Sequence, residues 1–210
     1  MDIVLFGIQG SGKGTVGKAV AEKFGFKIFE TGSALRALSQ ETSELALKVK
    51  SIIEAGHLVP NEVVMDIIEN FMQGLQPGEK VLFDGIPRKM EQAESFDALM
   101  QKHGRDFTGI FIEVPDEVAV KRLLTRRICK NCKNVYPASY EEKTCQKCGG
   151  ELITRSDDNP ESIKNRLQAF FDETMPVIQH YQKMGKMKKV NGDESIEIVA
   201  NGVSAIISSL

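Results

Sequence analysis

The sequence lacks several features that mark other classes of protein. It has no basic excess, because 27 lysines and arginines stand against 29 acidic residues, for a formal net charge of -2. Nucleic-acid-binding proteins usually carry such an excess, so an anionic ligand here would have to be bound by lysines and arginines gathered in a pocket. No apolar run is long enough to cross a bilayer, and no basic segment precedes the short apolar run at 3–6. We therefore expect a soluble, cytoplasmic protein with no nucleic-acid or membrane partner.

Blocks of like charge and low-complexity segments are also absent, which argues against a disordered tail. Hydrophobic residues make up 41% of the chain and charged residues 27%, a balance typical of globular proteins. A length of 210 residues is enough for one domain with a substantial core. We therefore expect a single domain, with room for small insertions.

Short apolar runs alternate with helical stretches along the chain. The runs at 3–6, 81–83 and 110–114 are each followed by a stretch of helical periodicity, which is typical of an α/β fold. Asn159 and Pro160 predict the start of a long helix, and Pro176 predicts a kink or a boundary within it. Residues 127–158 replace the alternation with cysteines, polar residues and turns, which indicates an insertion. Helices are expected at 13–25, 33–54 in two pieces, 61–73, 89–102, 116–126, 160–184 and 193–209.

A glycine-rich loop follows the first apolar run. Residues 7–15 read GIQGSGKGT and lead into a helical stretch. Glycines let the backbone wrap closely around a ligand with its N–H groups pointing inward, and the helix N-terminus adds a positive dipole. The loop predicts a nucleotide phosphate site, with Lys13 on the β- and γ-phosphates and the Thr15 hydroxyl near an oxygen associated with Mg²⁺. Gly14 moves that hydroxyl one position from the general GK[ST] pattern, and a merely flexible glycine turn is the alternative.

Asp84 ends the second apolar run. An acidic residue at the carboxyl end of a buried parallel strand, beside a phosphate loop, can hold Mg²⁺ directly or through water. A turn or helix cap is the other common role of aspartate at a strand end. The phosphate loop favours the metal role for Asp84.

The four cysteines all fall within twenty residues of each other. Cys129 and Cys132 form one C-x-x-C pair, Cys145 and Cys148 form a second, and twelve residues separate the pairs. Four thiolates complete a tetrahedral shell with no open position for water, which predicts one structural Zn²⁺. Ferrous iron or cobalt could occupy the same ligands in vitro. Free thiols or a transient disulfide are the alternatives.

Six motifs in this order make the chain resemble the adenylate kinases over nearly its whole length. They are residues 7–15, 31–36, 56–60, 83–88 with Gln92, Arg126 with Arg127, and 155–158 with Arg166. The resemblance implies a single domain over 1–210 with the P-loop nucleoside monophosphate kinase fold, an α/β fold with a five-stranded parallel sheet core. It also implies an AMP-binding insert at 30–59 and a lid at 126–163, which carries zinc in some long members of the family. The implied reaction moves the terminal phosphoryl group of MgATP to AMP and gives two ADP, in a monomer.

The resemblance also implies a role for particular residues. The transfer itself would involve Lys13, Asp84, Arg88, Arg126, Arg155 and Arg166. ATP would contact Gly10, Ser11, Gly12, Lys13, Gly14, Thr15, Arg122, Arg126, Val135, Tyr136 and Glu194. AMP would contact Thr31, Arg36, the backbone of His57, Leu58 and Val59, then Gly85, Ile86, Pro87, Arg88, Gln92, Arg155 and Arg166. Gln92 would select adenine, because a side-chain amide can donate to one edge nitrogen of the base and accept from its amino group.

Several positions depart from the usual pattern of the family, but none removes a phosphate-binding charge. We expect Ser33, where aspartate is common, to cap the helix that starts there. The side chains of His57, His103 and His180 show no metal or triad spacing, so we interpret them as structural or surface groups. The other departures from the family pattern are Gln9, Asn61, Ile86 and Lys89.

The competing interpretations of the sequence are a kinase for UMP, CMP or GMP and a zinc-ribbon binding protein.

Overall fold

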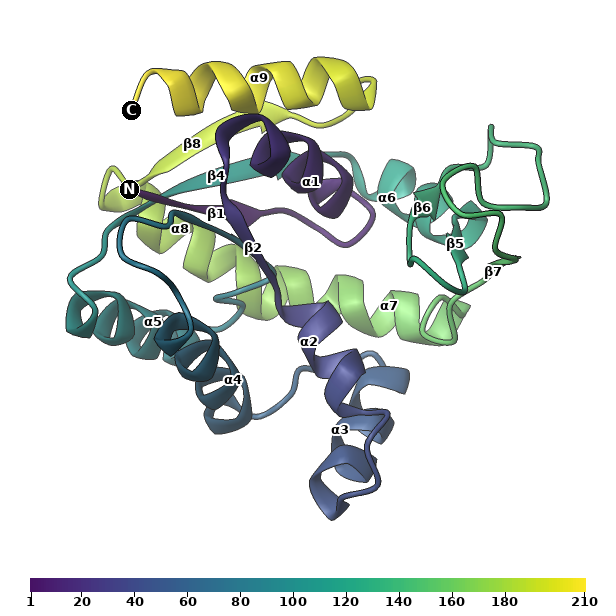
Figure 1. Ribbon diagram of the computed structural model, residues 1–210, viewed down its shortest axis with the longest axis horizontal. Helices are drawn as coiled ribbons and strands as arrows, with labels where there is room; N and C mark the ends of the chain where they lie inside the picture. Colours follow the sequence, from purple (N-terminus) through teal and green to yellow (C-terminus); the bar gives the residue numbers. More distant parts are fainter.

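A five-stranded parallel sheet forms the centre of the computed structural model, which describes residues 1–210 (Figure 1). Its strands are β1 (Asp2–Phe6), β2 (Lys27–Glu30), β3 (Val81–Asp84), β4 (Phe107–Glu113) and β8 (Met187–Asn191), in the spatial order β2-β3-β1-β4-β8. Every neighbouring pair is parallel, which confirms the predicted core. The apolar runs of the sequence predict the three central strands but neither of the two at the edges, β2 and β8.

Helices cover both faces of this sheet. On one face α1 (Lys13–Phe24) and α9 (Ile196–Ser208) pack against Ile3 and Leu5 of β1. On the other face α4 (Asn61–Gln73), α5 (Met90–Lys102) and α8 (Met175–Lys183) pack around Val4 and Phe6. Successive side chains of a strand point to opposite faces, so one strand supplies both cores. No helix is both long enough and apolar enough to span a membrane.

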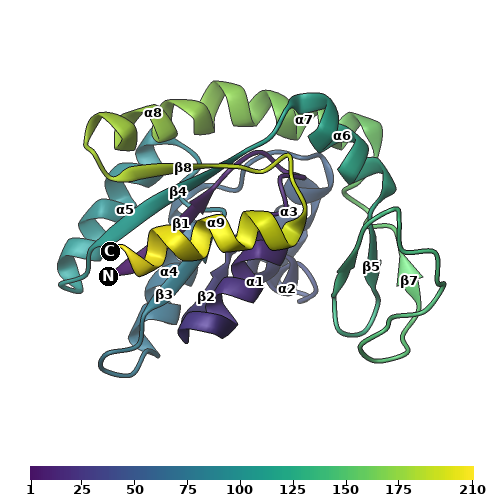
Figure 2. The ribbon, with the colours of Figure 1, turned by 90° about the horizontal axis from the view of Figure 1, so that it is seen from above.

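Two segments extend from this core. Helices α2 (Thr31–Leu38) and α3 (Glu44–Glu54) follow β2 and project beyond the sheet (Figure 1). After α6 (Asp116–Thr125), the short strands β5 (Arg127–Cys129), β6 (Val135–Tyr136) and β7 (Leu152–Ile153) form a separate antiparallel sheet in the order β6-β5-β7. This small sheet stands away from the main one, at the end of the molecule opposite the two termini (Figure 2). The chain returns to the core through α7 (Pro160–Ala169).

The long helix predicted at 160–184 is interrupted, as Pro176 predicts. A π-helical turn, η1 (Phe170–Thr174), separates α7 from α8, and Pro176 lies at the beginning of α8. Proline has no N–H to donate to the preceding turn, so regular α-helical bonding cannot run through this position. The start of α7 is also as predicted, because Asn159 accepts a hydrogen bond from the Ser162 amide at 2.9 Å.

One local prediction is wrong. Ser33 does not cap a helix, because α2 already begins at Thr31 and Glu30 occupies the capping position. The Ser33 hydroxyl instead donates a hydrogen bond to the Glu30 carboxylate at 2.7 Å. The strand β2 runs directly into α2, with no turn between them, and this carries the helix start two residues upstream of the expected one.

Candidate functional site

The glycine-rich loop joins β1 to α1, at the carboxyl end of the central strand. Gly10 has a positive φ of 91°, and a Cβ at this position would lie 2.5 Å from the Ala119 carbonyl oxygen, so a side chain would be excluded twice over. The Lys13 ammonium folds back over the loop and donates to the carbonyl oxygens of Gly7 at 2.5 Å and Ile8 at 3.0 Å. Burial lowers the pKa of Lys13 to about 8, although the nearby Asp84 carboxylate opposes the shift. The loop thus holds one desolvated cation at its centre.

Asp84 reaches the same loop from the end of β3. Its Oδ2 lies 3.6 Å from the position that a Cβ on Gly14 would take. Burial raises the pKa of Asp84, and Lys13 and Arg88 act in the opposite direction. A hard carboxylate oxygen beside a phosphate loop fits the ligand preference of Mg²⁺. Thr15, the other predicted metal-side residue, is exposed in the first turn of α1.

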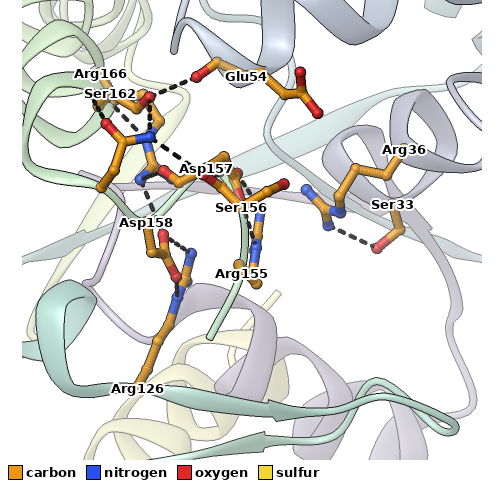
Figure 3. Close-up of polar contacts among 11 residues, drawn as sticks. Ser33, Arg36, Glu54, Arg126, Arg155, Ser156, Asp157, Asp158, Ser162 and Arg166 are labelled. Atoms are coloured by element: carbon orange, nitrogen blue, oxygen red, sulfur yellow. Dashed lines mark hydrogen bonds and ion pairs between the residues drawn. The ribbon is translucent and has the colours of Figure 1, made fainter. Parts of the chain in front are cut away.

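Two buried aspartates tie three of the predicted arginines together (Figure 3). The Asp158 carboxylate, whose side chain is 0% exposed, accepts from Arg126 Nε at 2.5 Å and Nη2 at 2.7 Å, and from Arg166 Nη2 at 2.9 Å. Asp157 accepts from Arg155 Nε at 2.8 Å and lies 3.5 Å from Arg166 Nη1. The arginines come from the end of α6, the loop after β7 and α7, so the aspartates fix three separate segments relative to one another. Both aspartates belong to the motif at 155–158, but their role as partners of the arginines was not predicted from it.

Two further arginines face this network from the core and from the projecting helices. Arg36 of α2 points toward Arg155 (Figure 3), and burial together with the Arg155 charge lowers the pKa of Arg36 to about 10. Burial also lowers the pKa of Arg88, and the charges of Arg166 and Arg155 add to the effect, whereas Asp84 opposes it. Like charges gathered in a partly desolvated site are unfavourable without an anion. The structure therefore brings the five predicted arginines into one region of concentrated positive charge, which suits an anionic ligand.

Arg88 is held by contacts on three sides. Its Nε donates to the Gly85 carbonyl at 2.8 Å, and its backbone N–H donates to Gln92 Oε1 at 2.8 Å. Its carbonyl accepts from the Thr174 hydroxyl of the π-helical turn at 3.0 Å. Thr174 was not among the predicted residues. The only sequence signal near it is Pro176, two residues further on, which predicts a break in the helix. Because the Gln92 oxygen takes the Arg88 N–H, its NH₂ group remains the available donor of this buried amide.

The other predicted AMP-side residues lie around the same edge of the sheet. Thr31 is 5% exposed, and its hydroxyl has no hydrogen-bond partner within the protein. A buried hydroxyl without a partner is costly, so this atom fits a place where a ligand supplies the bond. Val59 is buried, Leu58 is half-buried and His57 is exposed. Gly85 has a positive φ of 85°, and Ile86 and Pro87 after it are buried and joined by a cis peptide bond.

The predicted ATP-side residues outside the phosphate loop lie on α6, in the loop after β8 and in the small sheet. Arg122 Nη1 donates to the Gly192 carbonyl at 3.1 Å, which ties α6 to the loop after β8. Glu194 in that loop is exposed. In the small sheet Val135 is 39% exposed, whereas Tyr136 turns inward and its hydroxyl lies 3.1 Å from Cys145 Sγ. The Tyr136 side chain therefore packs within the small sheet.

The four cysteines converge as the spacing predicts. Their sulfur atoms all lie within 4.8 Å of one another, and none forms a disulfide. Cys129 Sγ is 3.4 Å from Cys148 Sγ, and Cys132 Sγ is 3.5 Å from Cys145 Sγ. Four sulfurs at such distances suit the tetrahedral shell of one ion. The arrangement is compatible with a zinc site.

Helix α7 also joins the projecting helices to the core. The last carbonyls of α3 have no partner within that helix, and Ser162 and Asn165 of α7 satisfy two of them. The Ser162 hydroxyl donates to the Glu54 carbonyl at 2.5 Å, and Asn165 Nδ2 donates to the Ala55 carbonyl at 2.9 Å. Gly56 follows with a φ of 80°, and a Cβ there would lie 2.6 Å from the Ser162 carbonyl oxygen. The first turns of α7 thus touch both the projecting helices and the arginine network.

Comparisons with known proteins agree with this geometry. A family model described as Adenylate kinase matches residues 5–186 of the chain. An adenylate kinase of Archaeoglobus fulgidus is 36% identical over 215 residues, covering 100% of this chain and 99% of the relative. One from Desulforamulus reducens is 37% identical, covering 97% of this chain and 98% of the relative. One from Oceanobacillus iheyensis is 36% identical, covering 99% of each.

Proposed function

The chain belongs to the adenylate kinase family, and from this premise we propose that it transfers the terminal phosphoryl group of MgATP to AMP, reversibly, to give two ADP. The observation that carries the proposal is the gathering of Arg36, Arg88, Arg126, Arg155 and Arg166 beside the Lys13 loop. So many partly desolvated cations fit the phosphates of two nucleotides better than those of one.

The chemistry needs no general base from the protein. The attacking group is a phosphate oxygen of AMP, which is already anionic, so the rate must come from alignment and charge neutralisation. In this proposal Lys13 and Arg88 hold the phosphates in line, while Arg126, Arg155 and Arg166 neutralise charge that develops during transfer. Asp84 would hold Mg²⁺ beside the loop, and the ion would supply further neutralisation of the phosphate charge.

The two bases would be recognised in different parts of the site. The acceptor adenine would lie against Gln92, whose free NH₂ group can donate to a ring nitrogen, and near the unpartnered hydroxyl of Thr31. The donor adenine would lie between Arg122 and the loop that ends at Glu194, where Arg122 is already fixed to the backbone of Gly192. The protein would thus recognise the acceptor adenine by hydrogen bonding and the donor adenine by packing.

Two segments would close over the nucleotides. We propose that the insert at 30–59 covers AMP and that the lid at 126–163 covers ATP, which excludes water as a competing acceptor. The four cysteines would hold one structural Zn²⁺ that keeps the small sheet of the lid ordered, because four thiolates leave no position for substrate. A monomer contains every predicted residue of the site, so we propose that the protein works as one.

A coupled assay of ADP formation tests the proposal. Purified protein is given MgATP together with AMP, UMP, CMP or GMP, and we expect turnover with AMP to exceed that with the others by far. The Arg88→Ala variant shows that the activity belongs to this chain, since loss of one charge at the transferring group should lower turnover on the order of 10³-fold. A preference for another monophosphate would reassign the acceptor. No ADP with any acceptor would reject the proposed reaction.

A further inference from the structure

We propose that Glu30 is a second acidic residue of the magnesium site and that, together with Asp84, it binds the hydration shell of the metal. The inference rests on the proposed MgATP-dependent reaction. It concerns a residue that the sequence analysis did not single out, and the strand pairing and the loop geometry indicate it independently.

Strand pairing places Glu30 and Asp84 side by side. Glu30 is the last residue of β2, Asp84 is the last of β3, and the two are direct partners in this parallel pair. Paired residues point to the same face of a sheet. Their predecessors Phe29 and Phe83 belong to the core on the α4 and α5 side, so Glu30 and Asp84 point to the opposite face, where α1 begins. Carboxyl ends of parallel strands are where α/β folds bind ligands.

The two carboxylates approach the same point of the phosphate loop. A Cβ built on Gly14 would lie 3.6 Å from Asp84 Oδ2 and 3.6 Å from Glu30 Oε1. In the general GK[ST] loop this position carries the hydroxyl that binds Mg²⁺, and Gly14 has no hydroxyl to offer. Two acidic oxygens thus face the place where the usual metal ligand is missing. Mg²⁺ keeps several of its waters when bound, and carboxylates at this distance from the loop suit hydrogen bonds to those waters.

The contacts of Glu30 leave one of its oxygens available. Oε2 accepts a hydrogen bond from the Ser33 hydroxyl, at 2.7 Å. Oε1, the oxygen that faces Gly14, has only Lys18 nearby, at 3.5 Å, and the Lys18 side chain is 49% exposed. An exposed ion pair at this distance contributes little, so Oε1 can turn to a metal-bound water at small cost. Ser33 therefore orients the carboxylate while its second oxygen remains free.

The structure also offers a second role for Glu30, on the AMP side, and the experiment must distinguish it from the metal role. Arg36 Nη2 donates to the Ser33 hydroxyl at 3.3 Å, so Glu30 could act on the AMP side alone, through Ser33 and Arg36. The two roles differ in the ligand whose affinity depends on the Glu30 charge. In the proposed role the charge sets metal affinity, and in the other it sets AMP affinity.

The test measures Mn²⁺ binding to the full-length protein saturated with a non-hydrolysable ATP analogue. Mn²⁺ replaces Mg²⁺ because free Mn²⁺ is counted directly by electron paramagnetic resonance, and no turnover is needed. Glu30→Gln keeps the size of the side chain and an acceptor for Ser33 but removes the charge. We expect this variant to bind Mn²⁺ roughly 5- to 20-fold more weakly, as for loss of one water-mediated charge contact, while its affinity for the analogue in EDTA does not fall.

Three control variants make the result specific. Ser33→Ala cuts the connection to Arg36 and keeps the carboxylate, so its Mn²⁺ affinity should stay within about twofold of the parent protein. Lys18→Met removes the opposing cation, so Mn²⁺ affinity should be unchanged or higher. Glu22→Gln removes an exposed charge of α1 and should change nothing. Circular dichroism checks folding, and Glu30→Asp, which withdraws the carboxylate by one methylene, replaces Glu30→Gln if that variant does not fold.

The outcomes separate this inference from the proposed reaction. Mn²⁺ affinity of Glu30→Gln within about twofold of the parent overturns the role of Glu30 in the metal site. A fall in AMP affinity with unchanged Mn²⁺ affinity also overturns it and assigns Glu30 to Ser33 and Arg36. Failure of the parent protein to form ADP would count against the proposed reaction alone, because the difference in Mn²⁺ affinity is measured without turnover.

Discussion

The Asp158→Asn substitution would remove the negative charge at the centre of the arginine network. Asp158 is fully buried and accepts three hydrogen bonds, two from Arg126 and one from Arg166. The amide keeps the shape of the side chain and one acceptor oxygen. Its NH₂ group, however, would point at a guanidinium that has only hydrogens to present, so at least one bond would be replaced by a donor–donor contact.

The expected loss of stability follows from that arrangement. Hydrogen bonds to charged groups contribute about 1.5–3 kcal/mol each, and breaking a buried ion pair costs about 3–5 kcal/mol because a charge is left uncompensated. For a chain of this length about 1 kcal/mol shifts the thermal midpoint by roughly 2–4 °C, so we expect the midpoint to fall by about 6–20 °C. Arg126 and Arg166 would also lose their fixed positions, and a displacement on the order of 1 Å near the reacting groups costs about 10²-fold in turnover.

Differential scanning calorimetry and the coupled ADP assay measure both effects, the assay being run well below the variant's midpoint. Asp172→Asn is the matched control, since Asp172 is exposed and accepts only from Gln168, at 2.8 Å. We expect that control to match the parent protein. A midpoint shift of less than about 2 °C for Asp158→Asn, with turnover within about threefold of the parent, would refute the reasoning from burial.

Three further predictions concern pH, the acceptor base and the metal. Burial lowers the pKa of Lys13 from 10.5 to about 8, so ATP affinity of the free protein should weaken as pH rises through about 8, and calorimetric affinities that stay flat to about pH 9.5 would contradict this. The same shift affects the free energy of unfolding. Between pH 8 and 10.5 the unfolded chain binds more protons at Lys13 than the folded chain does, so burial of Lys13 destabilises the fold fully below pH 8 and progressively less as pH rises from 8 to 10.5. Gln92→Ala should raise the KM for AMP much more than that for ATP, and equal changes in initial-rate measurements would show that the two base sites are wrongly divided. Elemental analysis should find one zinc per chain, and absence of any transition metal would defeat the assignment. A strong chelator should lower the thermal midpoint, because structural zinc contributes about 10–16 kcal/mol of apparent binding energy, while part of the activity persists below that midpoint.

The sequence predicts the centre of the fold better than its edges, for a physical reason. The central strands are buried on both faces and appear as apolar runs, such as 81–83 before Asp84. The edge strands carry charged residues because one side of each meets solvent, as Lys27 of β2 and Lys188 of β8 show, and so they have no apolar run. Periodicity and turn signals therefore found the helices around both strands without finding the strands.

The site follows a similar rule. The phosphate loop and the cysteine pairs are local patterns whose spacing alone fixes what their residues can do, and the structure brings the cysteines together as predicted. Other contacts of the site join residues that are far apart in the sequence. Asp158 is 32 residues from Arg126, and Glu30 is brought beside Asp84 only by strand pairing. No spacing along the sequence indicates these two contacts, whereas Arg155 and Asp157 are only two residues apart.

The first turns of α7 have a consequence for how the two nucleotides affect one another. Ser162 and Asn165 hold the last carbonyls of α3, and Arg166 beside them belongs to the aspartate network that also holds the end of α6. A displacement of this part of α7 would therefore act on the end of α3 and on the end of α6 at the same time, and these border the proposed AMP insert and lid. If both nucleotides favour the same position of α7, AMP strengthens ATP binding by the same factor as ATP strengthens AMP binding, since such a coupling free energy is reciprocal. The two nucleotides would then be coupled by thermodynamic linkage through the first turns of α7, where Ser162 already contacts Glu54.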